Sequence, residues 1–313
     1  MGNSTVDAAK NYPFEEIRSV SQYMRHIESA TRQLKSDMIR DEYLAFRGQS
    51  NIAYELIPSL ARPLKYRADV QMLHFEKELI YTAQHEYPKE FLNIDSPTEL
   101  LIKLQHYGIP TRLLDITTNA LVALYFACCS SPDVDGEVFV FKLRRDYHWN
   151  DSLTEFIADT YRLDLAEASI MDCAEIYSKQ TYYVKKPNVQ DDFDIYYEFR
   201  NDMDYSHKNP IVVQPPKTFE RLNMQSGQFL LFTNDLCYDA NGIPVEIDSS
   251  IHPIAKSHPF IRSAVRIPHD TKDDILRELA ILGITRSALF HDNIDVVCEE
   301  IVKTIHQRTK QGK

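Results

Sequence analysis

Residues 104–127 read LQHYGIPTRLLDITTNALVALYFA, and this stretch determines the centre of the predicted fold. From Ala120 to Cys129 the chain is apolar on nearly every side, and Thr118 or Asn119 can cap a helix that begins there. A helix that is apolar all round belongs in a protein interior. The following run, GEVFVFKL at 136–143, has the composition of a strand. The sequence therefore predicts a buried helix followed by a strand.

The flanking elements predict an α+β fold. Further short apolar runs predict strands at 43–46, 211–213, 229–232 and 260–267. Helical periodicity predicts helices at 14–38, 68–86, 99–107 and 272–282, with a last helix from Asp292. We interpret residues 144–207 as an insertion on the main domain, with helical stretches near 152–179 and an acidic, tyrosine-rich patch at 191–204. We expect a central mixed or antiparallel sheet with helices before, within and after it.

Composition limits the functional classes. The 313 residues carry 35 Lys and Arg against 46 Asp and Glu, a net charge of −11, which argues against a wide basic face that coats duplex nucleic acid. A local basic pocket is still compatible with this charge. The 5 cysteines show no CxxC spacing, so we expect neither disulfides nor a metal site. Without a secretory signal or a run of 18 apolar residues, we expect a cytoplasmic protein with no membrane partner.

The first cluster of interest is Phe46-Arg47-Gly48-Gln49, at the end of the predicted strand 43–46. An arginine at a strand end presents a guanidinium at the sheet edge, and the following glycine lets a backbone or a ligand approach closely. The alternative is a structural arginine paired with a nearby carboxylate.

The second cluster runs from Gln105 to Asn119 and places His106, Arg112 and Asp115 between two apolar helices. A histidine can serve as acid, base or anion ligand near neutral pH, and an arginine forms a fork for phosphate or carboxylate. The alternative is an Arg112–Asp115 ion pair that ties the loop down, with His106 as a hydrogen-bonded bystander.

The third cluster is Glu220–Phe229, in which Arg221 and Gln225 are spaced so that they share one face of a helical turn. Gly227 then turns the chain into a strand. The alternative is an ordinary connection between helix and strand.

These motifs together resemble the FRG domain, a bacterial and phage domain named for its Phe-Arg-Gly motif. The resemblance is carried by FRGQS at 46–50, the stretch 104–127, RLNMQSGQFLLF at 221–232 and IPHDTKDDILRELAILGITRSALFHD at 267–292. One departure is Ile116, where an aromatic residue, usually tryptophan, follows the aspartate in the family. The resemblance implies that the three clusters meet in one site. It also implies an FRG domain at 41–292, with the insertion at about 144–207, after an N-terminal helical segment at 1–40 and before a C-terminal helix and tail at 293–313.

The family's members resemble prophage, toxin-like and anti-phage defence proteins, which implies a role in the conflict between phage and host. A further analogy is to ADP-ribosyltransferases of the Arg-Ser-Glu type, whose core begins with a strand that ends in (Phe/Tyr)-Arg-Gly and whose arginine holds the phosphate of NAD. This chain lacks their Ser-Thr-Ser strand and Glu-x-Glu turn, and Gln225 and Gln228 occupy the approximate place of that turn.

The leading hypothesis is a phage-defence or toxin-like effector with an arginine-lined pocket for NAD or another nucleotide, with an ADP-ribosyltransferase-like fold and reaction as its narrowest form. The expected catalytic residues are His106, Asp115 and Gln225. The expected substrate-binding residues are Arg47, Gly48, Gln49, Tyr107, Thr111, Arg112, Asn119 and Arg221. The alternative is a non-catalytic module that uses the same pocket to bind a nucleotide, a nucleic-acid end or a phage protein.

Overall fold

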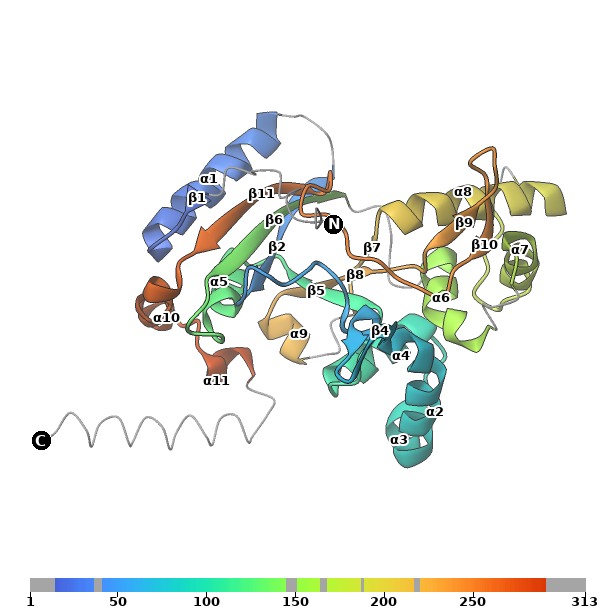
Figure 1. Ribbon diagram of the computed structural model, residues 1–313, viewed down its shortest axis with the longest axis horizontal. Helices are drawn as coiled ribbons and strands as arrows, with labels where there is room; N and C mark the ends of the chain where they lie inside the picture. Colours follow the sequence, from blue (N-terminus) through green and yellow to red (C-terminus); the bar gives the residue numbers. More distant parts are fainter. Residues whose placement is uncertain are drawn as a thin grey trace, which may run out of the picture.

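The computed structural model describes residues 15–36, 41–144, 151–163, 168–186, 189–216 and 220–290. Its centre is a seven-stranded mixed sheet in the order β1-β11-β6-β2-β5-β8-β7 (Figure 1). Neighbouring strands are antiparallel except β1 and β11, which are parallel. The strands of this sheet are β1 (Glu15–Glu16), β2 (Glu42–Gln49), β5 (Leu113–Thr117), β6 (Gly136–Arg144), β7 (Ile211–Val213), β8 (Gly227–Leu231) and β11 (Ile261–Ile267). The expected α+β fold with a mixed central sheet is confirmed.

Two small ribbons and a set of helices surround the sheet. The ribbons pair β3 (Pro63–Leu64) with β4 (Arg67–Gln71), and β9 (Leu236–Tyr238) with β10 (Pro244–Ile247). The helices are α1 (Val20–Ser36), α2 (Glu76–Glu86), α3 (Pro88–Phe91), α4 (Pro97–His106), α5 (Ala120–Cys128), α6 (Ser152–Asp159), α7 (Ile170–Ser178), α8 (Asp192–Lys208), α9 (Glu220–Met224), α10 (Lys272–Ile281) and α11 (Arg286–Leu289). Short 3₁₀ turns lie at η1 (Ser59–Ala61), η2 (Met72–Phe75), η3 (Thr160–Arg162) and η4 (His269–Thr271).

Three apolar clusters hold these layers together. The first packs α1, α5 and α10 against β2, β6 and β11, in the left half of Figure 1. The second lies on the opposite face of the sheet, where η1 and the segment around Ile251 and Ile254 cover β2, β5 and β6. The third joins α2, α3, α4, α6, α7 and α8 to β7 and β8. The helices α6, α7 and α8 and the β9–β10 ribbon form the right-hand lobe of Figure 1.

The buried helix α5 lies unusually close to the sheet, and two glycines allow this. A Cβ atom added at Gly48 would lie 1.8 Å from the carbonyl oxygen of Ala123, and one at Gly136 would lie 2.3 Å from that of Ala127. Because Ala123 and Ala127 are one helical turn apart, the helix rests on the sheet backbone to backbone. The amide oxygen of Asn119 caps this helix by accepting from the N–H groups of its first turn, as expected.

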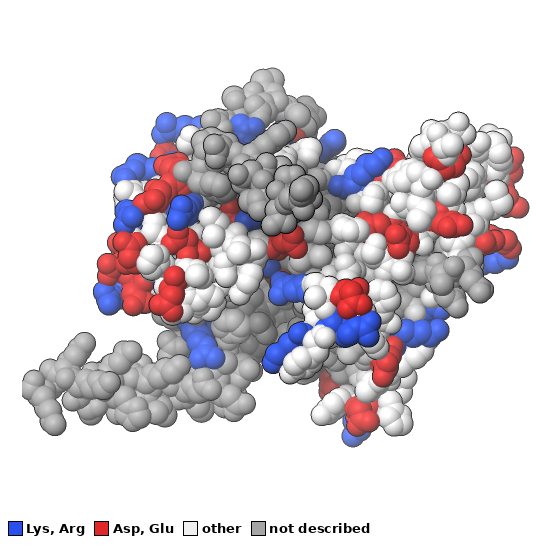
Figure 2. Space-filling view, viewed as in Figure 1, with Lys and Arg blue, Asp and Glu red and all other residues white. Residues whose placement is uncertain are grey.

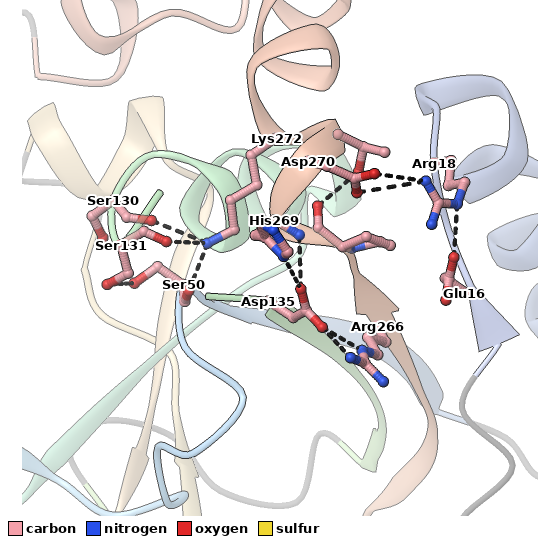
Figure 3. A network of polar contacts seen from close by, with 12 residues as sticks. Glu16, Arg18, Ser50, Ser130, Ser131, Asp135, Arg266, His269, Asp270 and Lys272 are labelled. Atoms are coloured by element: carbon pink, nitrogen blue, oxygen red, sulfur yellow. Dashed lines mark hydrogen bonds and ion pairs between the residues drawn. The ribbon is translucent and has the colours of Figure 1, made fainter. Parts of the chain in front are cut away.

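A polar network fastens the start of α10 to the ends of β2 and α5 (Figure 3). The buried Lys272 Nζ donates to the carbonyl oxygens of Ser50, Ser130 and Ser131 at 2.7, 3.1 and 2.9 Å. Beside it, Asp135 accepts from the His269 N–H at 2.8 Å and from Arg266 Nε at 2.6 Å (Figure 3). Burial acts to raise the pKa of Asp135, but the bonds from His269 and Arg266 outweigh it and hold that pKa at about 2.

Some sequence predictions were wrong in detail. Glu15 and Glu16 form a strand that pairs with Val265 and Arg266 of β11, rather than the start of a helix. Local sequence could not predict this pairing, because the partner residues lie far away in the sequence. The helix expected at 68–86 begins only at Glu76, since residues 67–71 fold back on β3. The helix expected at 272–282 ends at Ile281, and Leu282 beyond it is 56% exposed. The helix expected from Asp292 lies outside the described residues.

Three expectations from composition concern membrane, disulfides and metal. In the described part of the chain, no helix has the length and apolarity to cross a membrane. The cysteines at 128, 129, 173 and 237 are free thiols. Within the same ranges, no cluster of three or more His, Cys, Asp or Glu residues is arranged to hold a metal ion.

Candidate functional site

The central sheet has a gap between β2 and β5. The strand β2 pairs with β6 at eight positions, from Glu42 to Gln49, but with β5 only where Phe46 lies opposite Thr117. A cavity of about 230 Å³ lies beside this single pair. Its polar walls come from Arg47, Asp115, Thr117, Gln225 and Gln228, and its apolar walls include Phe46, Val122, Phe126 and Leu222. Members of all three sequence clusters therefore line a single hollow, among them Arg47, Asp115 and Gln225.

The half-buried Arg47 spans the gap. Its Nη1 donates to the backbone carbonyl oxygen of Asp115 at 2.6 Å, and its Nε donates to Gln49 Oε1 at 3.4 Å. Burial lowers the pKa of the Arg47 guanidinium to about 10, against the raising effect of the Asp115 charge and with a further lowering by Arg62. The guanidinium is still protonated at neutral pH. Within the described residues its hydrogen-bond acceptors are neutral oxygen atoms, so the cation has no ion-pair partner of its own.

The carboxylate of Asp115 is exposed and held from one side. Gln105 Nε2 donates to its Oδ1 at 2.8 Å. Gln105 Oε1 in turn accepts from the hydroxyl of the buried Thr111, and that hydroxyl accepts from the N–H of Leu113 at 3.2 Å. Thr111, expected to bind substrate, is instead linked to the cavity through two hydrogen bonds: it positions Gln105, and Gln105 holds Asp115. This chain of bonds explains why the loop between α4 and β5 needs both residues.

Two glutamines form the third wall. Tyr43 donates its hydroxyl to Gln228 Oε1 at 2.7 Å. Gln225 Nε2 donates to the carbonyl oxygen of Leu289 in α11 at 3.0 Å, and its own backbone carbonyl accepts from the Thr117 hydroxyl at 2.6 Å. The segment after α9 is therefore tied to both β5 and the C-terminal α11.

Arg112 does not line this cavity. Its side chain is 1% exposed, its Nε donates to Glu76 Oε1 at 2.9 Å, and its Nη1 donates to Asn234 Oδ1 at 3.0 Å. A second short contact joins Nη2 to the other oxygen of Glu76. The expected alternative was an ion pair with Asp115, and the partner is instead Glu76 at the start of α2. Arg112 therefore has a structural role in the fold. Among the residues that line the hollow, the one arginine is Arg47.

His106 and Tyr107 lie at the end of α4 and are not among the residues that line the cavity. Their rings meet edge to face at 5.2 Å, and Tyr107, 57% exposed, packs in the same way on Phe91 at 5.7 Å. The end of α4 therefore contributes to the hollow through Gln105 rather than through His106.

The remaining predicted residues have mixed placements. Gly48 lines the cavity and carries the close contact with α5. Gln49 is buried, and its Nε2 donates to the carbonyl oxygen of Tyr54 at 3.1 Å. Asn119 uses its amide oxygen to cap α5. The side chain of Arg221 lies outside what the structure describes.

Sequence reasoning missed Tyr43, Gln105 and Thr117. A strand places alternate residues on one face, so Tyr43 and Arg47 share a face of β2, and this alternation could have pointed to Tyr43. Gln105 stands next to His106 in the same motif, and local sequence does not show which of the two neighbours faces the sheet. Thr117 gave no signal, because its role depends on the backbone of Gln225, 108 residues further on.

Comparison with known families identifies one region of the chain. Residues 42–136 match the family model of the FRG domain, so the chain contains an FRG domain that runs from the start of β2 to the start of β6. The match includes Arg47, Gly48 and Asp115, while Gln225 and Gln228 come from outside it. No curated protein and no solved structure matches the chain.

Proposed function

We propose that this FRG-domain protein binds a small ligand of the nucleotide class, NAD included, in the hollow between β2 and β5. The observation that carries the proposal is the state of Arg47: a half-buried cation that lines a cavity and whose acceptors, among the residues that the structure describes, are neutral oxygen atoms. A phosphate supplies the charge that is missing there, and a guanidinium binds phosphate with strong charge-assisted hydrogen bonds.

The charge of the whole chain supports a local pocket rather than a binding face. The net charge is −11, and on the face drawn in Figure 2 Lys and Arg lie interspersed with Asp and Glu. An anion is therefore attracted to a single enclosed cation and not to a broad surface. This distribution favours a small ligand over a nucleic-acid duplex.

The shape and lining of the hollow support a ligand with both an apolar ring and polar groups. Phe126, Val122 and Leu222 form an apolar wall, while Asp115 and the two glutamines offer hydrogen-bonding groups. Its volume of about 230 Å³ is below the roughly 300–1,000 Å³ typical of sites that bury a whole drug-sized ligand. We expect the hollow to enclose one end of the ligand and to leave the rest outside.

An enzyme is the narrower form of the proposal. Asp115 is the carboxylate that lines the hollow, and a carboxylate there can accept ribose hydroxyl protons and stabilise positive charge that develops on a sugar. His106 is not among the residues that line the hollow, so in this form Asp115 would carry the proton work. Cleavage of NAD, or ADP-ribosyl transfer from it, belongs to this narrower form. A phage-defence or toxin-like role rests on the family resemblance.

Titration calorimetry with ADP, NAD and inorganic phosphate tests the proposal. We expect Arg47→Met to weaken binding of ADP and NAD by about 10- to 100-fold, the range for loss of a hydrogen bond to a charged group. The matched control is Arg67→Met, which removes an exposed arginine paired with Asp69 and should leave affinity unchanged. Equal affinities for wild type and Arg47→Met would refute the site. Release of nicotinamide from NAD by wild type but not by Asp115→Ala would establish the enzyme; binding without turnover of NAD would establish a binding module.

A further inference from the structure

A second hollow of the described chain runs along α2, the helix near the bottom of Figure 1. Its volume is about 620 Å³, and it shares no lining residue with the hollow between β2 and β5. The lining comes from α2 and its two ends, from the region of the β3–β4 ribbon and from the loop after α4. We call this hollow the α2 groove.

The floor of the α2 groove is apolar. It follows α2 through residues spaced one helical turn apart, namely Phe75, Leu79, Ala83 and Tyr87. The first and last of them are exposed to solvent, while the small Ala83 between them leaves room above it for a bulky apolar side chain. Leu64, Met72 and Ile109 add apolar side chains from outside α2.

Two carboxylates border this apolar surface. Glu78 and Glu86 line the groove, and Thr82 lies midway between them on the same face of α2. Both glutamates are exposed, and neither has an ion-pair partner within the residues that the structure describes. None of the lining residues is Lys or Arg. Because eight helical residues rise about 12 Å, the groove carries two unpaired negative charges separated by about that distance along α2.

The helix under the groove is fixed to the rest of the fold. Ile80 and Ala83 belong to the apolar core, and Glu76 at the start of α2 accepts from the buried Arg112. A partner that docks here therefore meets a surface that is already formed, which lowers the entropic cost of association.

We propose that the α2 groove is a docking site for an amphipathic helix of a partner protein, in which an apolar stripe lies between two Lys or Arg residues seven or eight positions apart. On a helix such residues lie about 10–12 Å apart along the axis, which matches the spacing of Glu78 and Glu86. The apolar stripe covers the floor, and the two cations pair with the two carboxylates.

A helix suits this surface better than an extended peptide does. Strand addition needs the free backbone edge of a sheet, whereas the floor of the α2 groove consists of side chains of a helix. Helices pack on such a floor by placing their side chains between its ridges. An exposed apolar patch with a polar rim is typical of a surface that binds another protein.

A display library of helical peptides tests the proposal on the full chain. The library keeps a helix-forming framework and randomises the positions of one face, and selection on the wild type is followed by counter-selection on Thr82→Arg. We expect the recovered peptides to carry Lys or Arg seven or eight positions apart, with apolar residues between them.

A matched pair of variants locates the binding of a recovered peptide. Thr82→Arg places a long cation between the two carboxylates and should weaken the peptide by about tenfold or more, as like charges brought together do. His85→Arg makes the same side chain at an exposed position of α2 outside the groove, and it should leave the affinity unchanged.

Charge reversal tests the stated chemistry of the partner. The double variant with Glu78→Lys and Glu86→Lys should weaken the recovered peptide by about tenfold or more. A copy of the peptide with glutamates in place of its two cations should bind this variant better than it binds the wild type. Such a rescue excludes misfolding of the variant as the cause of the loss.

Several outcomes would overturn the proposal. Recovery of no peptide, or of peptides with acidic or neutral flanks, contradicts the stated partner. Equal affinity for wild type and Thr82→Arg would mean that the peptide binds elsewhere. Self-association of the full chain that Thr82→Arg abolishes would identify a second copy of the chain as the occupant. None of these results depends on the binding of nucleotides at Arg47.

Discussion

Arg47 in β2 and Arg112, which immediately precedes β5, have opposite surroundings. Arg112 is closed off: Glu76 and Asn234 occupy three of its nitrogen atoms, and 1% of the residue is exposed. Arg47 faces a hollow and bonds to a backbone carbonyl and, at 3.4 Å, to an amide. The difference shows that a charged residue beside an apolar run does not by itself mark a site. What distinguishes the two arginines is the partner of each guanidinium: Arg112 pairs with the carboxylate of Glu76, whereas Arg47 bonds to neutral oxygen atoms.

The gap in the sheet explains why Arg47 is open. Had β5 paired with β2 along its length, the Asp115 carbonyl would accept from a backbone N–H of β2 as in an ordinary antiparallel ladder. Because the strands pair only at Phe46 and Thr117, this carbonyl accepts from the Arg47 side chain instead. The arginine thus bridges the strands and remains accessible to a ligand on the side of the hollow.

The largest effect on stability should come from removing the carboxylate that pairs with the buried Arg112. Glu76→Ala leaves Arg112 buried without its carboxylate, which typically costs about 3–5 kcal/mol of unfolding free energy. Chemical denaturation would measure it. Glu78→Ala on the same helix removes an exposed carboxylate and should change stability by less than about 0.5 kcal/mol. Similar losses in both variants would mean that Glu76 is not the essential partner of Arg112.

The next largest effect concerns the helix that backs the hollow. In Gly48→Ala the new Cβ would collide with the Ala123 carbonyl oxygen, so α5 must shift, at a cost of about 3 kcal/mol. As a comparison, Gly242 has φ +74° and open space around it. Gly242→Ala should therefore cost only the roughly 1–2 kcal/mol of left-handed strain. Thermal melts of the two variants rank them, and an unchanged melting temperature for Gly48→Ala would contradict the close packing of α5.

A substitution of Asp115 tests whether its carboxylate pairs with Arg112 or lies beside Arg47 at the hollow. Its carboxylate is exposed and bonded to Gln105, and Arg112 has a different partner. We therefore expect Asp115→Asn to lower the unfolding free energy by less than about 1 kcal/mol, the range for a surface hydrogen bond, while affinity or turnover falls. A loss of several kcal/mol would restore the Arg112–Asp115 pair that the sequence suggested.

A pH-dependent effect is expected in the polar network around Asp135. The pKa of Asp135 is depressed to about 2 from an ordinary value of 3.8, so its contribution to stability is complete above about pH 4 and disappears as the pH falls through about 2. Denaturation of wild type and Asp135→Asn between pH 2 and 6 measures this. The wild type should be the more stable protein at pH 6, and the difference should shrink toward pH 2. A constant difference would remove the pKa argument.

Sequence patterns predicted the elements that local chemistry determines. The all-apolar run gave α5, and the Asn119 cap marked where it begins. The resemblance implied that the three clusters meet in one site; Arg47, Asp115 and Gln225 line one cavity, whereas His106 and Arg112 are not among its lining residues. Local patterns could not predict the Glu76–Arg112 pair, since its partners are 36 residues apart and lie on separate elements. Nor could they predict that Gln105, next to His106 at the end of α4, is the residue that bonds to Asp115.

The most direct measurement of the central claim is a double one on Arg47→Met: its unfolding free energy by denaturant and its affinity for ADP and NAD by calorimetry. We predict an unfolding free energy within about 1 kcal/mol of wild type, since Arg47 has no ion pair among the described residues, and an affinity at least about tenfold weaker. A variant that binds as well as wild type, or that loses most of its stability as Glu76→Ala should, would contradict the account of Arg47 as an open cation for a ligand.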